Sequence, residues 1–573
     1  MAVLGAAAAI LVQGARMLGD FDLPWHLAVG RDVVDGGEIL AGDVLSYTMR
    51  GVIAPIEYPA DVLLYFLYRV GGTVALQLGG AACLLLVLWL LCLRSMPVSP
   101  LIALGMSCLA AAAANLWFVV RPAILSFPLL CAVLWTIERS MSRAGRPQQV
   151  RTRALSALVP LQLVWCHLHG FAVLGAGIAF SFAVYVGACR LARGRLGALL
   201  PIADGRDAPR VILLVGLAIM ATCVGPFGPK IFLGPFHVQA HTAVITEWAP
   251  TTLRFAITAD PTFALLAVIV LVVLAAAIVS RSAAVTAFDL GLVLVTLGLA
   301  VLRIRLIPIF ALCTAPIAAR ALPSAIVSLR SSRLAALLAA VTCSATFYGA
   351  PGIPIGRGFD ENNLPVGAVR FIQGARPSGR LFNFLPFGGY LAFQLHPQVS
   401  VFIDGRTAWL YPPELLAAYV AAEHDAKTFA SLSATYHFDW AVVRARPGER
   451  FAEPIARDPA FTLVYLDDCA AVYVRNDGPN AALAARGYRV LTHLTPPAGL
   501  LIHPPPSAAL DHDAALAVAQ APRSPRAHFI AAAAAAARGD RAALLGERHR
   551  LAEIAPDSPW IAALDEVLRA GSR

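Results

Sequence analysis

The first 350 residues alternate between long apolar runs and short polar loops. A helix of roughly 17–25 residues crosses the hydrocarbon core of a bilayer, so each long run is a candidate membrane span. About eleven runs fit this length, although the run at 155–169 is short enough to be a broken or re-entrant span. The runs lie at 2–18, 74–93, 100–119, 122–138, 155–169, 171–189, 211–228, 262–280, 284–301, 304–320 and 334–350. The pattern predicts a polytopic α-helical membrane core over residues 1–350.

A long acid-rich loop, residues 19–73, separates the first two runs. Within this loop, residues 22–34 and 57–68 place apolar side chains at helical spacing. Two helices that lie in the membrane interface, joined by a turn rich in glycine and aspartate, would hold carboxylates at a fixed depth. We therefore expect the rest of the membrane core to be organised around this loop.

After residue 350 the pattern changes to short strands that alternate with short helices. Alternation of this kind predicts a compact α/β domain over residues 351–500, with a partly parallel sheet. The expected helices lie at 366–373, 389–395 and 413–424, and the expected strands lie at 380–384, 399–403, 440–444, 461–466 and 470–474.

A run of prolines at 504–506 ends this region and leads into an alanine-rich tail, residues 507–573. Four short helices are expected there, at 511–521, 524–538, 541–554 and 558–570. Small residues at the helix contacts resemble those of tetratricopeptide (TPR) hairpins, but one or two units do not establish the period of a repeat. Helical hairpins of this kind usually bind proteins, so we expect a protein partner for the tail.

The composition agrees with a membrane protein. Soluble domains are roughly a quarter charged, whereas this chain is 14% charged and 58% hydrophobic. The net charge of +10 does not indicate nucleic-acid binding, because the arginines cluster in short loops between apolar runs. With the N-terminus in the cytoplasm, every dense cluster falls on the cytoplasmic side, as the positive-inside rule requires. The arginines of the expected cytoplasmic loops are Arg94, Arg139, Arg143, Arg146, Arg151, Arg153, Arg190, Arg193, Arg195, Arg206, Arg210, Arg281, Arg320, Arg330 and Arg333. The same orientation places the C-terminal region outside the cytoplasmic membrane.

Asp20 and Asp22 follow the first run directly and open the acidic loop. One interpretation is structural: both are interfacial carboxylates, and Asp22 caps a helix. The other is catalytic: one of them is a base that deprotonates an acceptor hydroxyl at the membrane surface, supported by Glu57 and His26. A divalent cation such as Mg²⁺ or Mn²⁺ could bridge Asp20, Asp22 and Glu57.

Further polar residues are expected at the outer ends of other spans. Each one alone is equally well explained as an interface anchor. Together they bring cations and imidazoles to the level of the loop carboxylates, which suits a lipid-linked phosphate and an incoming hydroxyl. They are Arg121, Arg303 and Arg305 as phosphate-binding candidates, and His167, His169, Glu247 and Trp248 as substrate-binding candidates. The two histidines are two residues apart, which does not place them on one helix face, so no zinc site is predicted.

Outside the membrane core, Asp404 and Arg406 flank a glycine after the strand expected at 399–403. A strand that ends in Asp-Gly usually turns there. The alternative is that Asp404 and Arg406 lie at a sheet edge and form part of the acceptor site.

These motifs resemble those of the GT-C superfamily of membrane glycosyltransferases, and within it a poorly characterised bacterial branch. The similarity to protein mannosyltransferases and lipid A aminoarabinose transferases is more distant, since those carry Asp-Glu where this chain has Asp-x-Asp. The resemblance covers most of residues 19–475. Its motifs are Asp20-x-Asp22, Asp22-Leu23-Pro24-Trp25-His26-Leu27-Ala28-x-Gly30-Arg31, Asp43-x-x-Ser46-Tyr47-Thr48, Arg121-Pro122, His169-Gly170, Glu247-Trp248-x-Pro250, Phe387-Gly388-Gly389-Tyr390 and Phe402-Ile403-Asp404-Gly405-Arg406.

The resemblance implies a transferase in the bacterial inner membrane with a periplasmic C-terminal domain. It implies inverting transfer of a sugar from a polyprenyl-phosphate carrier to a glycan, lipid or protein, with Asp20 or Asp22 as the base. The alternative is a non-catalytic scaffold, or a lipid or polymer transporter, of envelope polysaccharide assembly. Transporters commonly show two related halves, and no internal repeat is evident in the sequence.

Overall fold

The computed structural model describes residues 2–96, 98–141, 150–191, 205–234, 246–280, 282, 284–322 and 354–570. The chain forms two compact units. The helical unit comprises Met1–Asp20, Val29–Asp35 and Pro55–Gly358, and the α/β unit comprises Phe21–Ala28, Gly36–Ala54 and Phe359–Arg573. The first loop therefore contributes residues to both units.

The helical unit contains a helix in ten of the eleven apolar runs; the remaining run, 334–350, lies outside the described residues. Several of these helices begin with a proline in the first turn, where the fixed φ suits a helix and no N–H is lost. The ten helices in the apolar runs are α1 (Ala2–Ala15), α3 (Tyr58–Ser95), α4 (Pro100–Ala113), α5 (Pro122–Ser140), α7 (Leu158–Leu168), α8 (Ala172–Leu191), α9 (Ala208–Thr222), α12 (Pro261–Val279), α13 (Ala287–Leu302) and α14 (Ile307–Ala321).

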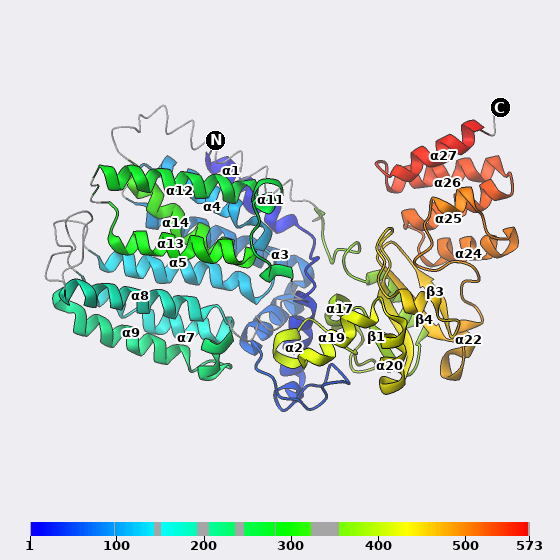
Figure 1. Cartoon of the computed structure of the whole chain (residues 1–573), viewed down its shortest axis with the longest axis horizontal. Helices are drawn as coiled ribbons and strands as arrows, with labels where there is room; N and C mark the ends of the chain where they lie inside the picture. Colours follow the sequence, from blue (N-terminus) through cyan, green and yellow to red (C-terminus); the bar gives the residue numbers. More distant parts are fainter. Residues whose placement is uncertain are drawn as a thin grey trace. The chain divides into compact units, whose positions relative to one another are not determined.

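Five of the described helical segments are long and apolar enough to cross a membrane: Tyr58–Ser95, Pro122–Ser140, Ala172–Leu191, Pro261–Val279 and Ile304–Ala321. The helix α14 is buried along nearly its whole length and packs against α3, α4, α12 and α13. The helices α7, α8 and α9 lie side by side (Figure 1). Outward-facing residues of α12, such as Val268 and Val272, are exposed, as in helices that contact lipid. These features indicate a multi-pass membrane protein.

The expected loop helix at 57–68 is the first part of α3, which continues to Ser95. The helical geometry breaks at Gly71 and Gly72, and Gly72 has φ 60° and ψ −150°. This backbone region is open essentially to glycine alone. The loop helix and the second apolar run are thus two segments joined by a glycine kink.

Four buried charges join α3, α5, α13 and α14 inside the helical unit. The guanidinium of Arg94 donates to both carboxylate oxygens of Glu138, at 3.0 and 3.1 Å. Arg320 donates to Glu138 at 3.2 Å and pairs with Asp289 at 3.4 Å. Asp289 in turn completes a capping box with Thr286 at the start of α13. These residues form the buried ion network of the helical unit.

The α/β unit contains a four-stranded sheet of order β1-β2-β4-β3. The strands are β1 (Arg380–Asn383), β2 (Phe438–Arg444), β3 (Phe461–Leu466) and β4 (Ala470–Arg475). Strands β1 and β2 are parallel, with Leu381 opposite Trp440, and the other two pairings are antiparallel. The prediction of a partly parallel sheet is therefore confirmed.

The prediction of a strand at 399–403 is wrong. This segment makes a single bridge, between Val401 and Ser46 of the first loop. The N–H of Val401 donates to Leu45 O at 2.9 Å, and its carbonyl accepts from Tyr47 N at 3.1 Å. The first loop occupies the backbone groups that a neighbouring strand would use, so no ladder forms.

Helices pack around the sheet and continue into the tail. Around the sheet they are α16 (Val366–Ala375), α17 (Leu385–Leu395), α19 (Pro413–Ala422) and α20 (Ala426–Tyr436). The tail helices α24 (Ser507–Gln520), α25 (Pro525–Ala537), α26 (Arg541–Ile554) and α27 (Pro559–Ala570) stack in chain order (Figure 1). These lie close to the four expected helices, while a TPR-type repeat stays a prediction.

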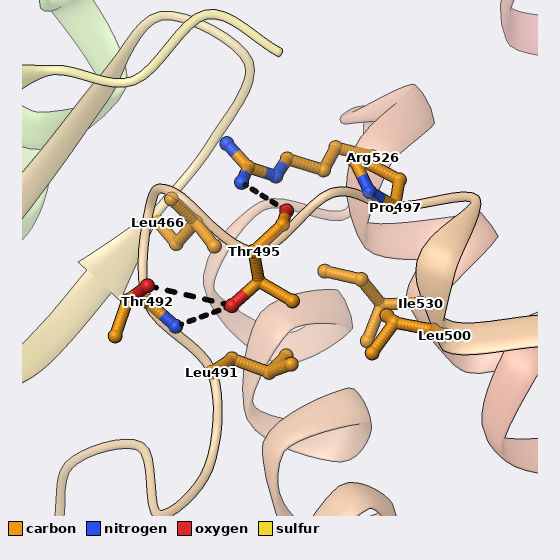
Figure 2. Close-up of a pocket in the computed structure, with 8 residues that line it drawn as sticks. All are labelled: Leu466, Leu491, Thr492, Thr495, Pro497, Leu500, Arg526 and Ile530. Atoms are coloured by element: carbon orange, nitrogen blue, oxygen red, sulfur yellow. Dashed lines mark hydrogen bonds between the residues drawn. The ribbon is translucent and has the colours of Figure 1, made fainter. Parts of the chain in front are cut away.

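Arg526, in the tail helix α25, forms hydrogen bonds with the rest of the α/β unit. Its side chain is buried, and it donates to Ala445 O at 2.6 Å and to His493 O at 2.8 Å. It also approaches Thr495 O at 3.4 Å, at the edge of a small pocket lined by Leu466, Leu491, Thr492, Pro497, Leu500 and Ile530 (Figure 2).

Candidate functional site

Two arginines of the helical unit converge on one carboxylate. Arg121 stands at the N-terminus of α5, Glu247 in a short 3₁₀ turn (η6, Thr246–Trp248), and Arg305 in a second one (η7, Ile304–Leu306). Nη2 of Arg121 donates to Glu247 Oε1 at 3.0 Å and to Oε2 at 3.2 Å. Nη1 of Arg305 donates to the same Oε2. We call these three side chains the anion site.

Asp20 lies beside the anion site, with its Oδ2 3.6 Å from Nη1 of Arg121. The chain just before Asp20 is held by backbone bonds from Met17 N to Pro354 O and from Leu18 N to Gly358 O, at 2.9 and 3.0 Å. The side chain of Gln77, on α3, donates to Gly356 O at 2.8 Å. Asp20 is therefore placed by packing of the segment that enters the first loop.

Aromatic rings flank Arg305. Its guanidinium carbon lies 5.6 Å from the centre of the Phe171 ring and 5.7 Å from that of Trp248. Rings at these distances attract a cation through their electron-rich faces. Phe171 also meets His169 edge to face at 4.6 Å, which extends the site to the loop between α7 and α8.

His169 connects the aromatic rings to Glu57. Its Nδ1 accepts the backbone N–H of Phe171 at 3.1 Å, so the ring proton of the neutral form is on Nε2. Nε2 lies 3.7 Å from Glu57 Oε1, which also accepts the N–H of Gly170 at 3.0 Å. Glu57, at the start of α3, is thus oriented by a backbone donor and faces an imidazole N–H.

The charge of Glu247 follows from its partners. Burial raises the pKa of this carboxyl, but the guanidiniums of Arg121 and Arg305 lower it further, and the net pKa lies below its ordinary value. At neutral pH the anion site therefore holds two cations and one carboxylate, with Asp20 as a second carboxylate next to Arg121.

Asp22 belongs to the α/β unit. Its Oδ1 accepts the indole N–H of Trp25 at 3.2 Å, and its backbone carbonyl accepts the N–H groups of Trp25 and His26 at the start of α2 (Leu23–Asp35). His26 is buried and its ring lies 3.4 Å from that of Trp25. The backbone carbonyl of Asp22 therefore closes the first turn, and its carboxylate holds a side-chain donor.

Two glycine motifs of the α/β unit leave room for the Asp22 segment. A Cβ atom at Gly405 would lie 2.7 Å from Asp22 Oδ1 and 2.9 Å from Trp25 Nε1. A Cβ atom at Gly389 would lie 3.0 Å from Trp25 N. The motifs at 387–390 and 402–406 are thus in contact with the motif that begins at Asp22.

Asp404 and Arg406, expected at the acceptor site, form a buried ion cluster with Asp43. Arg406 donates to both oxygens of Asp404, at 2.9 and 2.6 Å, and to Oδ1 of Asp43. The three side chains are at most 4% exposed. Burial raises the pKa of Asp43 even though Arg406 opposes this shift. The cluster holds the first loop against the 402–406 turn, which makes it a structural clamp. The sequence did not single out Asp43 as its third member.

The remaining candidates lie apart from the anion site in their described contacts. The ring of His167 bonds to Leu163 O of its own helix at 2.7 Å. Arg303 donates to Leu302 O at 3.2 Å, at the end of α13. Among the described residues, no group of three or more His, Cys, Asp or Glu side chains is arranged to hold a metal ion. Glu57 accepts from Gly170 and Asp20 pairs with Arg121, and a cation bridge between Asp20, Asp22 and Glu57 stays a prediction.

No known family profile matches the chain, and no curated protein matches it either. Several solved structures are similar to the chain. The oligosaccharyltransferase AglB of Archaeoglobus fulgidus, in complex with an inhibitory peptide and a dolichol-phosphate, aligns over 78% of this chain and 69% of its own, with 11% identity and a TM-score of 0.53. The apo form of the A. fulgidus oligosaccharyltransferase aligns over 83% and 74%, with 11% identity and a TM-score of 0.51. ArnT from Cupriavidus metallidurans, bound to undecaprenyl phosphate, covers 84% and 98% with 12% identity, but its TM-score of 0.36 is too low to indicate a shared arrangement.

At 11% identity the likeness shows that the chain shares the fold of the A. fulgidus oligosaccharyltransferase, and it assigns no activity.

Proposed function

We propose that this chain is a membrane glycosyltransferase that moves a sugar from a polyprenyl-phosphate carrier to an acceptor on the outer face of the cytoplasmic membrane. The observation that carries the proposal is the anion site, where Arg121 and Arg305 share the Glu247 carboxylate beside Asp20. Forked guanidiniums bind phosphate as they bind carboxylate. The fold supports the proposal, because AglB, which shares it, was solved with a dolichol-phosphate.

In this mechanism the acceptor hydroxyl attacks the anomeric carbon of the sugar, and its proton passes to a first-loop carboxylate. The bond between that carbon and the phosphate oxygen breaks with inversion, and the electron pair remains on the phosphate. Arg121 and Arg305 stabilise the charge that develops there. The base is Asp20 or Asp22, the two candidates of the first loop, and Asp20 lies 3.6 Å from Arg121, which it would orient.

Glu57 and His169 would position the sugar or the acceptor, since the His169 ring meets Phe171 and its Nε2 lies 3.7 Å from Glu57. We assign the α/β unit to the periplasm, where it would help to select a glycan, lipid or protein acceptor. The helical tail would bind a protein partner of the same envelope pathway.

The experiment is sugar transfer by membranes that contain Asp20→Asn, Asp22→Asn or the wild-type chain, with polyprenyl-phosphate-linked sugars as donors. Asp35→Asn, at the exposed end of α2, is the matched control. We expect at least one of the two Asn variants to lose transfer by about 10²-fold or more, as for a general base. Full activity of both Asn variants would show that the base is assigned wrongly. Comparison of surface glycans and lipid-linked intermediates with and without the gene identifies the pathway.

The helical hairpins of the tail favour a second candidate, a non-catalytic scaffold for envelope polysaccharide assembly. A scaffold would keep its function when Asp20, Asp22 and Arg121 are replaced, and would lose it when α24–α27 are deleted. The two candidates therefore predict opposite outcomes for the same pair of strains.

A further inference from the structure

In the anion site one carboxylate occupies the position that a phosphate would take. Arg121 reaches both oxygens of Glu247, and Arg305 donates to the second of them. A phosphodiester also offers two non-bridging oxygens and one negative charge. A guanidinium fork binds either group through the same pair of parallel hydrogen bonds. The donors around Glu247 are therefore arranged as for a bound anion, and a carboxylate of the protein itself accepts their hydrogen bonds.

The carboxylate is also the most accessible member of the group. The side chain of Glu247 is 31% exposed, against 18% for Arg305 and 6% for Arg121. The arginines have further contacts that do not depend on Glu247, because Arg121 pairs with Asp20 and Arg305 lies against Phe171 and Trp248. If the carboxylate left, both guanidiniums would keep partners that hold them in place.

The backbone next to Glu247 is fixed. Ile304 N donates to Ala249 O at 3.0 Å, and Thr251 N donates to Val301 O at 2.9 Å, so the segment after η6 is bonded to the end of α13 and the start of η7. Departure of the carboxylate then requires only rotation about the side-chain bonds of Glu247, between staggered rotamers. No backbone bond has to break.

We propose that Glu247 is an intramolecular stand-in for the substrate phosphate, which fills the anion site when no carrier is bound and is displaced when the carrier phosphate enters. The inference rests on the proposed function only in taking a polyprenyl phosphate as the anion. Because the carboxylate competes with the ligand, it lowers the apparent affinity by the fraction of time that the site is open. Its return after transfer assists release of the product phosphate.

The test measures binding of farnesyl phosphate to the full-length protein in detergent, with the alcohol farnesol as the reference for tail binding. Glu247→Gln keeps the size of the side chain and removes its charge. We expect this variant to bind farnesyl phosphate about tenfold more tightly than the wild type. Glu361→Gln, which removes an exposed carboxylate paired with Arg370 in the α/β unit, leaves the affinity unchanged. Arg305→Gln weakens binding.

If Glu247 instead holds the arginines in position for the ligand, Glu247→Gln binds farnesyl phosphate no more tightly than the wild type, or more weakly, and the proposal is overturned. Should Glu247→Gln fail to fold, Glu247→Asp decides in its place, because its shorter carboxylate competes less well and must also tighten binding. Sugar transfer is measured separately. Tighter binding by the variant without transfer by the wild type refutes only the proposed function, and transfer without tighter binding refutes only this inference.

Discussion

Gly405 leaves the space that the carboxylate of Asp22 occupies: a Cβ atom at this glycine would lie 2.7 Å from Oδ1 of Asp22. The same atom would lie 2.9 Å from Nε1 of Trp25, the donor that Asp22 accepts. The turn that carries Gly405 is held by the buried clamp of Arg406, Asp404 and Asp43. The α/β unit thus determines where the carboxylate of Asp22 can lie.

Gly405→Ala is expected to displace Asp22 and Trp25, because neither contact leaves room for a methyl group. Overpacking of this kind costs about 1–3 kcal/mol in the free energy of unfolding. We also expect sugar transfer to fall by more than the loss of folded protein explains. The measurements are transfer by purified protein and hydrogen exchange of the peptide that contains α2.

Gly374→Ala is the matched control for this variant, because a Cβ atom there meets no atom within 4 Å. Gly374 lies in the last turn of α16, where alanine is neutral or stabilising by up to about 1 kcal/mol. Equal effects of the two alanines would contradict the role given to Gly405.

Arg305→Lys and Arg303→Lys separate two arginines that the sequence treats alike. Lysine keeps the charge but loses the fork that reaches Glu247, so Arg305→Lys is expected to lower kcat/KM for transfer by about tenfold or more. The described hydrogen bond of the Arg303 side chain goes to Leu302 O, and the lysine variant is expected to keep transfer near the wild-type level. Steady-state kinetics with a polyprenyl-phosphate-linked sugar decide between them, and a larger loss at Arg303 would reverse the assignment.

Glu138→Gln removes the carboxylate that Arg94 and Arg320 share in the buried ion network. Their side chains are 0% and 1% exposed, so neither guanidinium gains water in return. Breaking a buried pair from one side costs about 3–5 kcal/mol. Thermal unfolding in detergent should show a large loss of stability. Asp207→Asn, which removes a partly exposed partner of Arg210, should change the free energy of unfolding by less than about 0.5 kcal/mol.

His493 should make the α/β unit less stable in acid. Burial lowers its pKa from 6.5 to about 4. Between these values the unfolded chain binds a proton that the folded chain does not, so the free energy of unfolding falls as the pH drops through this window. The full effect is about 3 kcal/mol.

The measurement is hydrogen exchange of the β4 peptide in the full-length protein across this pH range. His493→Asn should flatten the pH dependence, because the titrating ring is gone. His503→Asn, at an exposed position just before the prolines at 504–506, should leave it as in the wild type. A steep dependence that persists in His493→Asn would assign the effect to another group.

The sequence predicted the helices of the helical unit well, because an apolar run long enough to span a bilayer has few other ways to satisfy its backbone. In the α/β unit it missed α20 (Ala426–Tyr436). The prediction of a strand at 399–403 was wrong because the local sequence pattern does not show which distant segment will pair with it. Its β-forming residues are extended, but the neighbour that takes their hydrogen bonds is the first loop, some 350 residues earlier in the chain.

The three residues of the anion site were among the sequence candidates, but their pairing was not predicted. Arg121, Glu247 and Arg305 were all candidates, yet nothing in the sequence indicates that one carboxylate joins the two arginines. Arg303 and Arg305 are two residues apart, and the 3₁₀ turn η7 sends their side chains to different partners. Asp404 and Arg406 were interpreted either as a turn or as part of the acceptor site. Nothing in the sequence indicates their contact with Asp43, which is 363 positions from Arg406 in the chain.

The buried ion network has a consequence for biogenesis. Arg94 is synthesised 226 residues before Arg320, whose guanidinium bonds to Arg94 O, and 44 residues before Glu138. An unpaired charge is costly within a bilayer. A nascent chain that has made α3 and α5 already holds the pair Arg94–Glu138, whereas Asp289 on α13 meets Arg320 only after α14 is made. The buried ion network is therefore complete only after α14 has been synthesised, and we expect the four helices to reach their final packing at that stage.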